Sequence, residues 1–93
     1  MPYQIEQNEI RYEENGAPLA HVTFEDHGPG VVAITHTFVD DTLRGRGIAG
    51  ELMVQLLQQL RADGRRAVPV CSYAVSWFEK HPEAADVLAA GGE

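Results

Sequence analysis

The sequence predicts an α+β fold: a mixed, mainly antiparallel sheet with flanking helices and one parallel, splayed pair of strands. Strand-like apolar runs fill the first half of the chain and end at 31–39. A helix-like run, apolar on two adjacent rows, follows at 48–63, and a short β-branched run comes next at 67–71. Because a strand, a helix and a strand in this order form a right-handed crossover, we expect 31–39 and 67–71 to be parallel neighbours.

The first strands are expected to form an antiparallel meander. Within 3–14, apolar residues stand at odd positions before Asn8 and at even positions after it, which indicates a bulge or a break between two strands. Asn15-Gly16 is the strongest hairpin signal in the chain, because both residue types tolerate the left-handed backbone of a two-residue turn. We therefore expect a return strand at 19–25.

Glycine and proline mark the ends of the later elements. The long helix is expected to stop at Gly64 in a left-handed conformation. Pro69 has no N–H to donate to a ladder, so its strand should lie at a sheet edge or diverge from its neighbour. A second helix is predicted at 73–80 and is broken at His81-Pro82, since a residue before proline avoids helical geometry. Residues 83–90 are expected to add a final helical turn or two.

The composition limits the classes of protein that this chain can represent. At 93 residues it is expected to form one small domain covering 1–93. Fourteen acidic and 7 basic residues give a net charge of −7, which disfavours nucleic acid as a partner and favours a cationic one such as an amine. No run approaches the roughly 20 apolar residues that cross a bilayer, so no membrane partner and a cytoplasmic location are expected.

Sulfur and imidazole ligands are sparse. A single cysteine, Cys71, rules out an internal disulfide and argues against a structural zinc site. The four histidines show no pair at helical ligand spacing. We therefore expect no metal.

The segment 43–50, Leu-Arg-Gly-Arg-Gly-Ile-Ala-Gly, carries the strongest functional signal. Its glycines allow successive backbone N–H groups to face one concavity, and the helix that follows adds the positive end of its dipole. Arg44 and Arg46 bring two of the 7 basic side chains beside it. The segment predicts a site for a phosphate-bearing ligand; the alternative is a glycine-rich turn with two solvated arginines.

Two other phosphate-binding motifs fit this segment less well. Gly45, Gly47 and Gly50 fit G-x-G-x-x-G, the dinucleotide fingerprint. That fingerprint needs an acidic residue about 20 positions further on, and 67–72 contains none. A Walker loop is excluded because no Gly-Lys-Ser/Thr follows.

The segment also resembles the signature of the GNAT superfamily of acetyl-CoA-dependent N-acetyltransferases. The signature, [Gln/Arg]-x-x-Gly-x-[Gly/Ala], is matched in full by 44–49. The runs 36–39, 68–73 and 80–83 are similar to those of the small, single-domain Yjdj-type subfamily. Together the motifs cover nearly the whole chain and imply a GNAT-like fold.

The resemblance implies a binding mode for acetyl-CoA, or for coenzyme A itself. The backbone N–H groups of the loop would hold the pyrophosphate; these residues are Arg44, Gly45, Arg46, Gly47, Ile48 and Ala49. The pantetheine arm would run along the end of the preceding strand, at Phe38 and Val39. The thioester would then lie near Cys71 and Tyr73.

Three residues are candidates for the chemistry. His36 is a candidate general base because imidazole is the side chain best suited to that role near neutral pH, but its alternation with Val32, Ile34 and Phe38 favours a buried core histidine. Cys71 is either an acyl acceptor or a tunnel-lining thiol. Tyr73 either donates a proton to the leaving thiolate or packs on the pantetheine arm.

Two functions stay open. Phe78 stands where larger relatives have a proton-donating tyrosine, and Trp77 beside it is expected in the core. The resemblance implies an N-acetyltransferase that acts on a small amine, a protein lysine or a protein amino terminus. The alternative is a coenzyme A or acyl-coenzyme A binding module with little or no catalysis.

Overall fold

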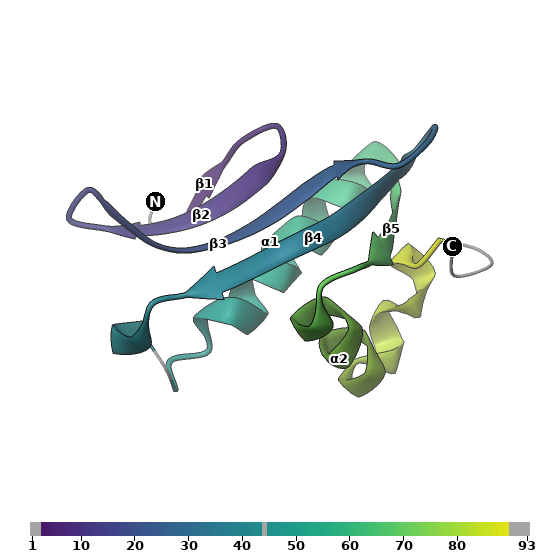
Figure 1. Cartoon of the computed structure of the whole chain (residues 1–93). Helices are drawn as coiled ribbons and strands as arrows, with labels where there is room; N and C mark the ends of the chain where they lie inside the picture. Colours follow the sequence, from purple (N-terminus) through teal and green to yellow (C-terminus); the bar gives the residue numbers. More distant parts are fainter. Residues whose placement is uncertain (1–2, 44, 90–93) are drawn as a thin grey trace.

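The computed structural model describes residues 3–43 and 45–89 (Figure 1). Its strands form one five-stranded sheet in the order β1-β2-β3-β4-β5, antiparallel except for the parallel pair of β4 and β5. The elements are β1 (Tyr3–Ile5), β2 (Glu9–Glu14), β3 (Ala17–Asp26), β4 (Val31–Val39), the 3-10 turn η1 (Asp41–Leu43), α1 (Ile48–Asp63), β5 (Arg66–Pro69), α2 (Ser72–Lys80) and the 3-10 segment η2 (Pro82–Val87). The predicted mixed sheet is confirmed.

The hairpin between β2 and β3 forms where the sequence indicates it. Asn15 and Gly16 both have positive φ, at 53° and 80°, as a tight two-residue turn requires. The strands on either side pair from Glu14 and Ala17 outward, so β3 begins earlier than the predicted 19–25. The break predicted near Asn8 separates β1 from β2.

A bulge divides β4 into two halves. Thr23 pairs with His36 but Phe24 pairs with Ile34, so Thr35 is an extra residue in β4. An extra residue shifts the alternation of side chains that follow it to the other face of the sheet. Ile34 is therefore fully buried, whereas His36 is exposed. The predicted core position of His36 is wrong for this reason.

Helix α1 covers one face of the sheet (Figure 1). Its apolar stripe supplies much of the hydrophobic core: Ile48, Leu52, Met53, Leu56, Leu57 and Leu60. The helix ends as predicted at Gly64, which has φ 71° and donates its N–H to the carbonyl of Arg61 at 3.3 Å. Arg65 donates to the carbonyl of Leu60 at 2.8 Å, which completes the terminal turn.

The parallel pair is short because β5 turns away from β4. Pairing runs from Val31 with Arg66 to Ile34 with Pro69. The N–H groups of Val70 and Cys71 then both donate to the carbonyl of Ile34, at 3.0 and 3.1 Å. Beyond that point β4 continues without β5. The predicted strand at 67–71 therefore ends early.

The C-terminal elements pack under β5 and against α1. Helix α2 ends at Lys80, before His81-Pro82, as predicted. Trp77 and Phe78 are each 7 % exposed and join the core. The predicted helical turns at 83–90 are, as far as residue 89, a 3-10 segment, η2, followed by a bridge between Leu88 and Ala67; residue 90 lies outside the described residues. Within 3–43 and 45–89, no helix is long and apolar enough to cross a membrane.

Candidate active site

A cradle of backbone N–H groups forms at the start of α1. Gly45 and Gly47 both adopt left-handed conformations, with φ 82° and 74°. Gly47 caps the helix, and no side chain of the described residues bonds to the cap. The first N–H groups of a helix have no partner within it, so those of the first turn, at Ile48, Ala49 and Gly50, face outward with the positive end of the dipole. This arrangement suits an anion.

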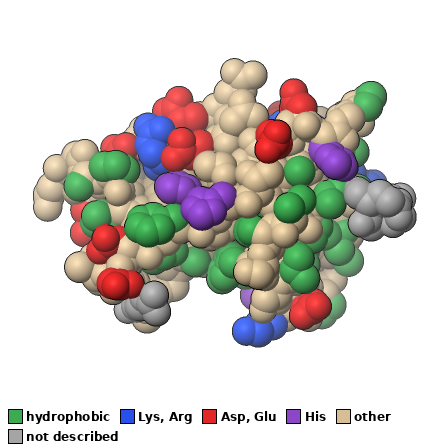
Figure 2. Space-filling model, in the orientation of Figure 1, with side chains coloured by type: hydrophobic (Ala, Val, Ile, Leu, Met, Phe, Trp, Pro, Cys, Tyr) green, Lys and Arg blue, Asp and Glu red, His purple; other side chains and the backbone are tan. Residues whose placement is uncertain are grey.

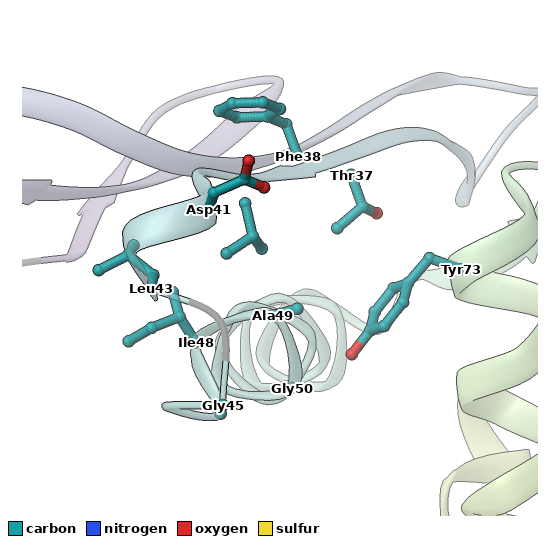
Figure 3. Close-up of a pocket in the computed structure, with 11 residues that line it drawn as sticks. Thr37, Phe38, Asp41, Leu43, Gly45, Ile48, Ala49, Gly50 and Tyr73 are labelled. Atoms are coloured by element: carbon teal, nitrogen blue, oxygen red, sulfur yellow. The ribbon is translucent and has the colours of Figure 1, made fainter.

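The cradle opens into a cavity of about 680 Å³ between the start of α1, the end of β4 and the first turn of α2 (Figure 3). Its walls are formed by Thr37, Phe38, Val39, Asp41, Leu43, Gly45, Gly47, Ile48, Ala49, Gly50 and Tyr73. Thr37 points into the cavity from β4, and Tyr73 reaches across from α2 toward α1. The ring of Phe38 lies on the opposite side of β4. The cavity thus joins the anion cradle to the place where β4 and β5 separate.

The end of β4 presents a backbone edge to this cavity. The N–H of Asp40 donates to the carbonyl of Leu19 at 2.8 Å, which fixes the phase of the ladder between β3 and β4. Because hydrogen-bonding direction alternates along an antiparallel strand, the backbone groups of Thr37 and Val39 point away from β3. Since β5 has already turned away, this edge is open to a strand-like ligand.

Thr37 and Cys71 meet where the two strands part. The hydroxyl of Thr37 lies 3.4 Å from the sulfur of Cys71. Cys71 is half-buried and directly precedes α2. It is absent from the cavity wall but touches Thr37, which forms part of that wall. Sequence reasoning missed Thr37, because the bulge that turns it inward was not foreseen.

Tyr73 contributes the phenol of the cavity. Burial raises the pKa of Tyr73 above its usual value, and the charge of a Cys71 thiolate would raise it further. The hydroxyl therefore keeps its proton at neutral pH and is able to donate it. Phe78 lies in the core against Trp77, with ring centroids 5.3 Å apart.

His36 occupies the opposite face of β4. Its ring lies 5.4 Å from that of His21, and the ring of Phe38 lies 5.5 Å from the same His21 ring. This face of the sheet is not covered by α1, and Figure 2 shows histidine side chains gathered on it. Among residues 3–43 and 45–89, no group of His, Cys, Asp or Glu side chains is placed to hold a metal ion.

Of the two arginines of the loop, the structure describes Arg46. Arg46 does not line the cavity; its guanidinium bonds to Glu14 of β2 at 2.9 Å. Arg44 lies outside the described residues. Of the loop residues predicted to hold the cofactor, the cavity wall includes Gly45, Gly47, Ile48 and Ala49.

An anion cradle that leads along an open strand edge to a half-buried phenol defines a site for a phosphate-bearing cofactor with a long, extended arm. The chain belongs to the GCN5-related N-acetyltransferase family, whose model matches residues 7–87. Members of this family, the GNAT family, are acetyl-CoA-dependent N-acetyltransferases.

Solved structures with the same fold support the assignment. A GCN5-like protein from Staphylococcus aureus is 24 % identical, with a TM-score of 0.78, over 94 % of this chain and 86 % of its own. An N-acetyltransferase from S. aureus Mu50 is 26 % identical, with a TM-score of 0.62, over 80 % of this chain and 50 % of its own.

A GNAT acetyltransferase from Brucella melitensis, solved with acetyl-CoA, is 25 % identical, with a TM-score of 0.58. The alignment covers 77 % of this chain and 49 % of that one. The chain thus spans about half the length of both these N-acetyltransferases. A comparison with curated proteins found no match.

Proposed function

We propose that this protein binds acetyl-CoA in the cavity between α1, β4 and α2 and transfers the acetyl group to a cationic amine, either a small molecule or a protein lysine or amino terminus. One observation carries the proposal: a single cavity joins the N–H cradle at the start of α1, the open edge of β4 and the hydroxyl of Tyr73. We also retain the Yjdj-type branch as the subfamily and the cytoplasm as the location.

The backbone supplies most of the cofactor contacts in this proposal. The N–H groups of Gly47, Ile48 and Ala49 would hold the pyrophosphate, as helix starts hold phosphate in other proteins. The outward-facing backbone of Thr37 and Val39 would pair with the amide-containing arm, as a neighbouring strand would. The cavity then directs the acetyl group toward Thr37 and Tyr73.

The acceptor must lose a proton before it attacks. A lysine of pKa about 10.4 costs about 4.6 kcal/mol to deprotonate at pH 7, so a base or a desolvating site is needed. We assign this role to His36, which lies on the open face of β4 at the level of the splay. An amine that approaches from that face would give its proton to His36 and attack the acetyl carbon.

Tyr73 completes the reaction on the cavity side. As the new N–C bond forms and the C–S bond breaks, the sulfur of coenzyme A gains negative charge. The phenol of Tyr73, which is protonated at neutral pH, donates its proton to this thiolate, and the second proton, released by the nitrogen as the amide forms, restores the phenol. It substitutes for the tyrosine that larger relatives carry where this chain has Phe78.

Cys71 is assigned a lining role in the sense that it supports the wall residue Thr37 and takes no part in the chemistry. Its sulfur contacts the hydroxyl of Thr37 at 3.4 Å and lies behind the cavity wall rather than in it. The acetyl group would therefore pass directly from cofactor to amine, without residing on Cys71.

The test is a mass-spectrometric screen of amines and peptides with acetyl-CoA. A mass gain of about 42 Da on a cationic amine corresponds to one added acetyl group. Such a product, if it is lost when Tyr73 or His36 is substituted, supports the proposal. Coenzyme A binding with no acetylated product across lysine peptides, peptide amino termini and polyamines would instead favour the alternative, a coenzyme A binding module.

A further inference from the structure

The second arginine of the cofactor loop is held by a neighbouring strand. The Nη2 atom of Arg46 donates to Oε2 of Glu14 at 2.9 Å and to the hydroxyl of Tyr12 at 3.4 Å. The Tyr12 hydroxyl itself donates to Glu14. Tyr12 is 7 % exposed, and its ring packs on Tyr3 with centroids 5.1 Å apart. The guanidinium is therefore tied to a side chain that is fixed in the core.

This contact restrains the part of the loop with the least intrinsic order. Arg46 lies between Gly45 and Gly47, and glycine loses more conformational freedom on folding than any other residue. The N–H of Arg46 donates to the carbonyl of Leu43 at 3.1 Å, so its backbone is tied to η1. Its side chain ties the same residue to β2. Between the two glycines, Arg46 is thus anchored at both its backbone and its side chain.

The carboxylate of Glu14 stays ionised over the neutral range. Hydrogen bonds from Tyr12 and then from Arg46 hold the pKa of Glu14 below its usual value. An ionised carboxylate competes with phosphate for the same guanidinium. As long as the pair persists, Arg46 is not free to reach a pyrophosphate in the cradle.

We propose that Glu14 and Tyr12 hold Arg46 as a clamp that orders the cofactor loop before the cofactor arrives, so that Arg46 is a positioning residue and not a phosphate ligand. The proposal rests on the proposed function for the identity of the ligand, coenzyme A. A loop that is already ordered loses less conformational freedom on binding, and affinity rises accordingly.

The substitution Glu14→Ala distinguishes the two alternative roles of Arg46, because its effect on coenzyme A affinity has opposite signs in the two cases. If Arg46 is a clamp, loss of Glu14 loosens the loop and weakens coenzyme A binding by on the order of 5-fold, the upper range for an exposed ion pair. If Arg46 is a phosphate ligand, loss of its competitor frees the guanidinium and tightens binding. Calorimetry with coenzyme A measures both outcomes, and Glu14→Gln should give a smaller change of the same sign.

A second measurement needs no cofactor. Backbone ¹⁵N order parameters of residues 45–49 in the free protein should fall in Glu14→Ala, because the tie to β2 is gone. Arg61→Ala is the matched control: Arg61, at the other end of α1, makes an exposed bidentate pair with Asp86 at 2.9 and 3.0 Å. It should change neither the order parameters of 45–49 nor the affinity for coenzyme A.

The outcomes distinguish this clamp from the proposed function. Tighter binding by Glu14→Ala, or unchanged order parameters at 45–49, would overturn the clamp while leaving the cofactor assignment intact. If the wild-type protein does not bind coenzyme A, but the order parameters of 45–49 still fall in Glu14→Ala, the clamp is supported and the proposed function is overturned.

Discussion

The hydroxyl of Thr37 lies 3.4 Å from the sulfur of Cys71, across the gap that opens when β5 leaves β4. The pair joins the two strands beyond their last shared residues, at the end of the cavity where the acetyl group is expected. It forms only because the bulge at Thr35 turns Thr37 toward the cavity.

Substitution of Cys71 tests whether its thiol carries the acetyl group. With a lining role, Cys71→Ala and Cys71→Ser should keep kcat within about 10-fold of the wild type, a change of roughly 1.4 kcal/mol in the barrier. Intact-mass analysis after incubation with acetyl-CoA should show no acetylated protein. A loss of several orders of magnitude with unchanged coenzyme A binding would make Cys71 the acyl carrier instead.

Coenzyme A should stabilise the protein against heat. Ligand at about 100 times its dissociation constant adds roughly 2.7 kcal/mol, which for a domain of this size raises Tm by on the order of 10 °C. Acetyl-CoA should act similarly and NAD much less, because the acidic residue of the dinucleotide fingerprint is missing. Melting curves that respond to NAD but not to coenzyme A would reverse the choice between the two motifs.

The substitution Gly47→Ala tests the geometry of the cradle, and Gly64→Ala is its matched control. Both cap α1 with left-handed φ, 74° and 71°, and an added Cβ would meet no atom of the described residues within 4 Å at either position. Alanine should therefore destabilise the protein by a similar roughly 1–2 kcal/mol in each case. Only Gly47→Ala should also weaken coenzyme A binding, by about 10-fold, because its methyl enters the cradle. Equal affinities of the two variants in calorimetry would exclude the loop as the cofactor site.

Tyr73 should matter for turnover and not for binding. Tyr73→Phe keeps the ring but removes the proton donor, so kcat should fall by about 10²-fold or more while coenzyme A affinity is maintained.

The phenol of Tyr73 also makes the stability of the folded protein depend on pH, and the sign of this dependence follows from its raised pKa. Because burial raises the pKa of Tyr73 above 10.0, the folded state keeps this proton when the unfolded state has lost it. The contribution to stability is therefore full below pH 10 and decreases as pH rises from there through the folded pKa. Denaturant unfolding should show a shallower alkaline loss in Tyr73→Phe than in the wild type, and parallel curves would argue against a buried phenol.

His36 and His21 form a second matched pair on the open face. Their rings are 5.4 Å apart, but only His36 belongs to the strand that borders the cavity. His36→Gln should lower kcat/KM for the amine at neutral pH, whereas His21→Gln should have little effect. Equal losses would point to a shared surface role rather than to a base.

Much of the fold was predictable because turn chemistry and periodicity agreed. The range of β4 matched 31–39 and that of α1 matched 48–63, since a glycine turn precedes each and the apolar period changes between them. Which side chains of β4 face the core and which face solvent was not predictable. Thr35 is β-branched and fits either alternation, so nothing in the sequence marks the bulge that exposes His36 and turns Thr37 inward.

The candidate site also has one part that the sequence predicted and another that only the structure shows. The glycine loop follows from local backbone requirements, and Gly45 and Gly47 take the conformations that their residue type favours. The contacts of Arg46 with Glu14 and Tyr12 join residues more than 30 positions apart, and only the folded sheet brings them together. The divergence of β5 after Pro69 agrees with the expectation from the missing N–H of that proline, whereas the double use of the Ile34 carbonyl is visible only in the structure.

The bulge at Thr35 has a consequence for the order of events in catalysis. Beyond the bulge, Thr37 faces the cavity (Figure 3), whereas His36 is exposed on the opposite face of β4. If acetyl-CoA and the amine bind from opposite sides as proposed, they do not obstruct each other, so we expect that either can bind first and that both are present when the acetyl group moves. Initial-rate lines at several fixed amine concentrations should therefore intersect rather than run parallel, and neither product should have to leave before the other substrate enters.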